Sequence, residues 1–174
     1  MASCGMTIAE TASMGPRYAK RLVDGIPTDR FARLSSPGGQ VVQANHPAFV
    51  LGHLCLYPVK VLEHLGVDST AVKPPAGFEE LFSKNATCQD DPDGSLYPPA
   101  DQLMSFFEES YAAAIEAIRQ APDELLSAPN PVDTPMKTVC TTLGSLLAFY
   151  LTGHVMTHLG QLSTWRRMEG LPPA

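Results

Sequence analysis

The segment Gly153-His154-Val155-Met156-Thr157-His158-Leu159-Gly160-Gln161, near the C-terminus, places two histidines four residues apart. On a helix such a pair shares one face at a separation of about 6 Å, which suits two ligands of one metal ion. The pair belongs to a stripe at helical spacing: Leu147, Tyr150, His154, His158, Gln161 and Trp165. The apolar members of the stripe predict that it faces the interior of a helical protein and that both histidines are buried.

A buried imidazole needs a partner because its desolvation is costly. Chance can place two of the five histidines at this spacing, and hydroxyl or carbonyl groups can satisfy such a pair in a core. Two interpretations therefore remain open at this point. The pair is either two satisfied core histidines, or two ligands of a metal site whose third ligand lies on a facing helix.

Apolar periodicity predicts two helices in the first third of the chain. The first covers about residues 7–26, with a capping box that starts at Thr7, and Pro16 should bend it or delay its start. The second covers about residues 47–65. Pro58 should bend this helix because proline removes one of its backbone hydrogen bonds.

Two more helices are predicted, at about residues 99–121 and 142–169, and no strand-like alternation is found. The connections between helices are rich in proline and glycine. The longest, residues 66–98, contains a short helical segment at 78–82 and can carry a crossover. We therefore predict an all-α fold, a four-helix bundle in a single domain that spans residues 1–174.

Composition excludes several classes of function. The net charge of −6, without a basic patch, argues against a nucleic-acid partner. No apolar run approaches the roughly 20 residues of a membrane span, and no signal peptide is recognisable, so we expect no membrane partner. The four cysteines lack paired or metal-type spacing, which favours free thiols and a cytoplasmic location.

The third ligand should come from the second helix, where His46, His53 and His64 share one face. His46 and His53 lie about 10.5 Å apart along the helix axis, so they cannot bind the same ion. Periodicity does not choose among the three, but the level of the site along the bundle favours His53. The neighbouring Gly52 would also permit a close approach of another helix.

Three stretches of the sequence together resemble the DinB/YfiT-like family. They are Asn45-His46-Pro47-Ala48-Phe49-Val50-Leu51-Gly52-His53-Leu54, then His154-x-x-x-His158-Leu159-Gly160-Gln161, and the terminal Arg166-Arg167-Met168-Glu169-Gly170-Leu171-Pro172. The resemblance covers nearly the whole chain. It implies a bundle of up-down-down-up order, with the long crossover between helices two and three, in which three histidines bind a divalent metal. Carried over by position, these ligands are His53, His154 and His158.

Three neutral imidazoles leave at least one coordination position open for water or substrate. The expected cofactor is one divalent metal ion, zinc or nickel in the first place and iron or manganese as alternatives. Residue 155 is a valine, so the glutamate base of an H-E-x-x-H peptidase is missing. The Glu-x-x-His pairs of di-iron bundles are missing as well.

Characterised relatives in the resembled family include enzymes that add a low-molecular-weight thiol to an electrophile, thiol-dependent isomerases and hydrolases. We therefore expect a metal-dependent transferase whose partners are a small thiol and an electrophile. A non-catalytic metal-binding or stress-associated protein and a metal-dependent hydrolase are the alternatives. Residues expected at the substrate are Tyr57, Tyr150, Gln161, which could instead orient a histidine, and Arg166. A homodimer is the expected assembly.

Overall fold

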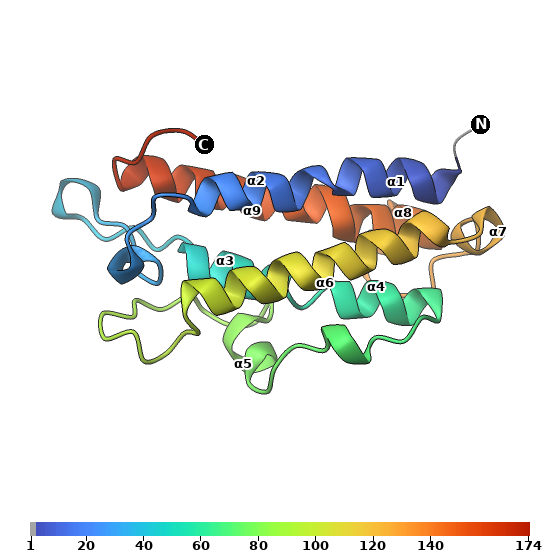
Figure 1. The fold of residues 1–174 in the computed structure, drawn as a ribbon, viewed down its shortest axis with the longest axis horizontal. Helices are drawn as coiled ribbons and strands as arrows, with labels where there is room; N and C mark the ends of the chain where they lie inside the picture. The colour runs from blue at the N-terminus through green and yellow to red at the C-terminus, as the bar shows by residue number, and fades with distance from the viewer. Residues whose placement is uncertain (1–2) are drawn as a thin grey trace.

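The computed structural model describes residues 3–174 and contains helices and loops, with no named strand in that range (Figure 1). The helices are α1 (Cys4–Ala12), α2 (Met14–Val23), α3 (Pro47–Leu54), α4 (Pro58–Leu65), α5 (Phe78–Phe82), α6 (Ala100–Gln120), α7 (Asp123–Leu126), α8 (Leu143–Ala148) and α9 (His154–Met168). A π-helical turn, Phe149–Gly153, joins α8 to α9, and short 3-10 turns lie at Thr28–Arg30, Pro37–Gly39, Thr70–Val72 and Pro135–Thr138.

Four rods form the bundle: α1 with α2, α3 with α4, α6, and α8 with α9. The first and fourth rods run in one direction and the second and third in the other, so the order is up-down-down-up (Figure 1). The long connection between α4 and α6, which includes α5, carries the chain back to begin the third rod. One continuous apolar core fills the space between the rods. The predicted all-α bundle and its order are confirmed.

The first rod starts earlier than predicted. Ser3 caps α1 by accepting a 3.1 Å hydrogen bond from the backbone N–H of Met6, whereas Thr7 lies inside the helix. The rod breaks at Ser13, between α1 and α2. Pro16 explains this position, because it has no N–H to donate to the carbonyl four residues before it, that of Ala12.

The second rod breaks between α3 and α4, where the sequence predicts a bend. Pro58 cannot donate to the carbonyl of Leu54, four residues before it. The buried hydroxyl of Tyr111 on α6 donates to that carbonyl instead, at 3.2 Å, and the N–H of Tyr57 does so at the same distance. The break is therefore compensated by hydrogen bonds within the bundle.

The fourth rod begins at Thr142, as predicted, with a reciprocal capping box to Ser145. The π turn inside it was not predicted. It changes the phase of the later residues of the rod. The expected burial of the histidine pair is met only in part: His158 is half-buried, and His154 keeps some exposed surface although its Nδ1 atom is closed to solvent, whereas Trp165 on the same stripe is fully buried.

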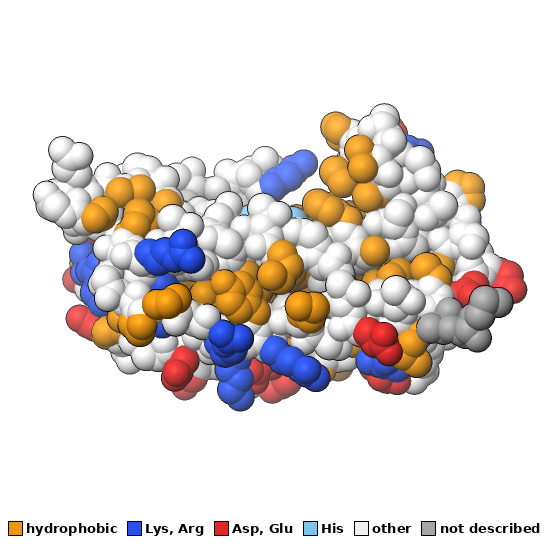
Figure 2. Space-filling view, turned by 90° about the horizontal axis from the view of Figure 1, so that it is seen from above, with side chains coloured by type: hydrophobic (Ala, Val, Ile, Leu, Met, Phe, Trp, Pro, Cys, Tyr) orange, Lys and Arg blue, Asp and Glu red, His pale blue; other side chains and the backbone are white. Residues whose placement is uncertain are grey.

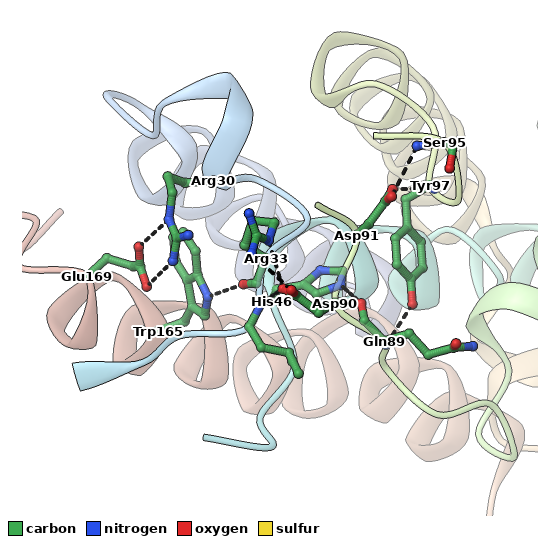
Figure 3. A network of polar contacts seen from close by, with 11 residues as sticks. Arg30, Arg33, His46, Gln89, Asp90, Asp91, Ser95, Tyr97, Trp165 and Glu169 are labelled. Carbon is green, nitrogen blue, oxygen red and sulfur yellow. Dashed lines mark hydrogen bonds and ion pairs between the residues drawn. The ribbon is translucent and has the colours of Figure 1, made fainter. Parts of the chain in front are cut away.

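Polar contacts fasten the loops to the end of α9 (Figure 3). The guanidinium of Arg30 donates two hydrogen bonds, of 2.8 and 2.9 Å, to the carboxylate of Glu169. The indole N–H of Trp165 donates to the carbonyl of Arg33, whose own side chain forms a two-point ion pair with Asp90. These contacts set the position of the segment that leads into α3.

One helical stretch, Pro47–Leu65, is long and apolar enough to cross a membrane, although no such run was expected from the sequence. Within this stretch, 67% of the most apolar 18-residue segment is buried inside the bundle. A core helix of a soluble protein has these properties, and the break at Pro58 divides the stretch into α3 and α4.

Candidate metal centre

Three imidazoles meet between α3 and the first turns of α9. His53 lies on α3, and His154 and His158 lie one turn apart on α9. One ring nitrogen from each lies within 4.8 Å of those from the other two, and the Nε2 atoms of His53 and His154 are 3.2 Å apart. Two nitrogens bound to a tetrahedral ion at about 2.1 Å would be about 3.4 Å apart. The three side chains could therefore hold a metal ion.

The backbone of α5 holds the His53 ring. The Nδ1 atom of His53 lies 2.7 Å from the carbonyl oxygen of Phe82. A carbonyl only accepts, so Nδ1 carries the proton and Nε2 keeps the lone pair that a metal needs. α5 can approach so closely because residue 52 is glycine: a Cβ at Gly52 would lie 2.5 Å from both Cδ1 and Cζ of Phe82.

A side-chain amide holds the His158 ring. The Nδ1 atom of His158 lies 3.1 Å from Oε1 of Gln161, and the same oxygen accepts a 3.1 Å hydrogen bond from Nδ2 of Asn45. With the proton on Nδ1, Nε2 is the nitrogen left to bind an ion. Of the two roles expected for Gln161, the structure supports the one that orients a histidine.

Among the described residues, one hydrogen-bonding contact reaches the ring of His154: its Nε2 atom lies 3.2 Å from that of His53. The Nδ1 atom of His154 is closed to solvent and has no hydrogen-bond partner among residues 3–174. Its ring lies against those of Tyr57 and Phe149, with centroids 4.1 and 5.8 Å away. Because Nε2 of His53 carries the lone pair, this contact without an ion has the proton of His154 on Nε2; an ion bound between the two Nε2 atoms would move that proton to Nδ1. This unpartnered ring nitrogen fits a metal site better than it fits a satisfied core histidine.

The π turn leads directly into His154. An inserted π residue rotates the remainder of the helix about its axis, and such insertions are frequent at functional sites. Here the turn carries Tyr150, whose ring centroid lies 5.2 Å from that of Tyr57. Tyr57, in turn, lies beside both His53 and His154. The two tyrosines expected at the substrate are therefore neighbours at the edge of the histidine cluster.

The cluster keeps its imidazoles neutral. Burial, followed by the charges that the nearby His158 and His53 would carry, lowers the pKa of His154 to about 3. Burial is also the largest cause of the lowered pKa of His53, and of that of His158. Because a metal binds the neutral ring, these shifts favour ligation over protonation near neutral pH.

The other two histidines of the second rod take no part in the cluster. The Nδ1 atom of His46 accepts from the N–H of Phe49 and so caps α3, while its Nε2 atom donates to the carbonyl of Gln89. Both ring nitrogens are therefore engaged, and neither can bind an ion. His64 lies in the last turn of α4, eleven residues from His53.

Arg166, expected at the substrate, has a different position. It is only 4% exposed, and its guanidinium donates to the carbonyls of Leu22, Asp24 and Pro172. It lies eight residues after His158, about 12 Å further along the axis. The expectation of a substrate contact is corrected: the geometry makes Arg166 a tie between the end of α2 and the C-terminal segment.

Solvent reaches the edge of the site. In the space-filling view, histidine surface is visible at the floor of a hollow, with a basic side chain beside it (Figure 2). The ammonium of Lys60 lies 4.9 Å from the ring centroid of Tyr57. Tyr57 lies beside His53 and His154, so the ammonium is close enough for its positive charge to add to the lowering of both pKa values.

Three contributors to the site were not predicted from the sequence: Asn45, Lys60 and the carbonyl of Phe82. Asn45 is adjacent to His46 in the stretch that resembles the family, but nothing local indicates that its amide reaches α9. Lys60 follows Tyr57 by three residues, a helical spacing that could have suggested contact. A backbone carbonyl has no sequence signal at all.

The comparison with protein families agrees with this architecture. The DinB superfamily profile matches residues 13–162, which include all three histidines of the cluster, and the chain belongs to this superfamily. No curated protein sequence matches the chain significantly.

Proposed function

We propose that His53, His154 and His158 bind one divalent metal ion, zinc or nickel in the first place, and that the protein is a metal-dependent transferase acting on a low-molecular-weight thiol. One observation carries the proposal: three neutral imidazoles converge beside a solvent-reached hollow, and the ligand group contains no carboxylate. Imidazole ligands suit zinc and nickel, and three of them leave a position for a substrate atom.

The lack of a carboxylate favours a thiol over water as the nucleophile. A metal-dependent hydrolase commonly uses a carboxylate to take a proton from the attacking water. Thiols have a pKa of about 8.5, and a bound metal lowers it far enough to give thiolate near neutral pH. A thiolate has no further proton to lose, so a separate base is not required.

The transfer step balances without an additional reactant. The thiolate sulfur forms a bond to an electrophilic carbon, and the bond from that carbon to a halide or an epoxide oxygen breaks with its electron pair. The thiol proton goes to solvent, or finally to the opened epoxide oxygen. Burial raises the pKa of Tyr57 and of Tyr150, so both phenols stay protonated and can donate a hydrogen bond to the leaving atom. The ammonium of Lys60 adds positive charge for anionic substrate groups.

Metal binding is tested first. Elemental analysis of the purified protein should find one divalent ion per chain, and the ion should be lost in His53→Ala. A His53→Ala variant that keeps a full equivalent of metal would refute the ligand assignment.

Turnover is then tested with a panel of cellular thiols and an epoxide or alkyl halide. His158→Ala should abolish thiol transfer while the helical content is kept. Thr157→Ala is the matched control, because its hydroxyl bonds only the carbonyl of Gly153 within the helix. Ester or amide hydrolysis without thiol would favour the hydrolase. Metal-dependent stability without any turnover would favour a non-catalytic metal-binding protein.

A further inference from the structure

The amide of Gln161 connects the two segments that hold the cluster. Its Oε1 atom accepts from Asn45, which lies just before α3, and from His158 on α9. Asn45 and Gln161 are 116 residues apart in the sequence. The backbone next to Asn45 is well anchored, because both ring nitrogens of His46 are hydrogen-bonded. The backbone that carries Asn45 is therefore held in place at the edge of the site.

The orientation of this amide decides which nitrogen of His158 carries the proton. With the oxygen of Gln161 facing the ring, Nδ1 must donate and Nε2 has a free lone pair. If both amides were turned over, the nitrogen of Gln161 would donate to Asn45 and to Nδ1 of His158. The proton would then lie on Nε2, and that nitrogen could not bind an ion.

We propose that Asn45 is a positioning residue: by donating to Gln161 it holds His158 in the tautomer with Nδ1 protonated and so sets the metal affinity of the cluster. The proposal rests on the metal binding proposed above. Groups that orient metal-bound histidines typically change affinity by about 10- to 100-fold when they are removed. Asn45 does not touch the cluster itself and acts only through Gln161.

Asn45→Asp tests this assignment with almost no change of shape. A carboxylate only accepts, so Gln161 must turn its nitrogen towards residue 45 and therefore towards His158. The proton of His158 should move to Nε2, and zinc affinity should fall about 10-fold or more. A new negative charge near a cation site would by itself raise the affinity. The change of tautomer lowers zinc affinity and the added charge raises it, so the direction of the measured change in affinity distinguishes the two effects.

Gln161→Glu is the matched control. It adds the same charge at the residue that contacts the His158 ring directly, but its carboxylate accepts from both Asn45 and His158, as the amide oxygen does. Its zinc affinity should equal or exceed that of the wild type. Gln161→Leu, which removes the acceptor, should weaken zinc binding. If Asn45 and Gln161 served packing alone, the changes in zinc affinity caused by Asn45→Asp and by Gln161→Glu would not have opposite signs.

Two measurements decide the outcome. Long-range proton–nitrogen NMR of the metal-free protein, above the ordinary imidazole pKa of about 6.5, reports the tautomer of His158 directly. Competition with a chromophoric chelator reports zinc affinity, and thermal unfolding confirms that each variant is folded. Asn45→Asp that keeps Nδ1 protonated, or that binds zinc as tightly as the wild type, overturns the proposal. If the wild type bound no metal, the proposed function would fail, whereas the NMR result would still decide the role of Asn45.

Discussion

Gly52→Ala gives the sharpest test of how the bundle supports the histidine cluster. The added methyl group would lie 2.5 Å from two ring carbons of Phe82, well inside the usual contact distance of about 3.5 Å. The ring cannot move aside easily, because Phe82 is fully buried and packed against Phe49, Phe78 and Tyr97. α5 must therefore shift by about 1 Å.

The expected cost is the balance of two opposing effects. Forcing a methyl group into a well-packed core costs up to about 3 kcal/mol. Alanine in place of glycine stabilises a helix by about 1 kcal/mol. The net loss in the free energy of unfolding should be about 2 kcal/mol. The shift should also lengthen the 2.7 Å bond from His53 to the carbonyl of Phe82, and so lower the affinity for zinc.

Urea unfolding of the metal-free protein measures the loss, and chelator competition measures the affinity. Gly160→Ala is the control, since a Cβ there meets no atom within 4 Å and the variant should be slightly stabilised. Phe82→Leu should relieve most of the clash in a double-mutant cycle with Gly52→Ala. If Gly52→Ala is as stable as Gly160→Ala, the close packing of α3 against α5 is refuted.

Three further predictions concern single interactions. His46→Asn should keep a cap on α3 but remove an imidazole whose pKa is lowered by burial from 6.5 to about 4. The unfolded chain binds this proton first, so as the pH falls from 6.5 to about 4 the wild type should lose about 3 kcal/mol more stability than the variant. Parallel urea-midpoint curves for the two proteins would contradict this. Tyr111→Phe should cost about 1 kcal/mol in urea unfolding, because the carbonyl of Leu54 loses a buried donor; no loss would argue against that bond. Zinc at about 100 times its Kd should add about 2.7 kcal/mol to the unfolding free energy of the wild type but not to that of His158→Ala. An equal gain in both proteins would show that the ion binds outside the three-histidine cluster.

Local sequence was enough to predict the helical architecture. Apolar spacing located the four rods, and Pro58 marked the break in the second rod, because a missing N–H is a covalent property of that residue. The start of the first rod was misjudged because Ser3 and Thr7 are both good caps and the sequence does not rank them.

The candidate cluster could be predicted only in part. Spacing grouped His154 with His158, and the distance along the second rod, with the family resemblance, favoured His53. The partial exposure of His158 was not predicted, because the sequence carries no clear signal for the π turn before His154. Arg166 was misplaced for a related reason: nothing near it in sequence announces the carbonyls of Leu22 and Asp24.

The surroundings of the histidines depend on tertiary structure. The carbonyl of Phe82, the Nδ2 atom of Asn45 and the hydroxyl of Tyr111 reach their partners across 29, 116 and 57 residues of chain. Periodicity describes which face of a helix a residue occupies, but such contacts also require the depth, tilt and phase of a second element. Helices and candidate ligands are therefore determined by local chemistry, whereas tautomers and exposure are decided by packing.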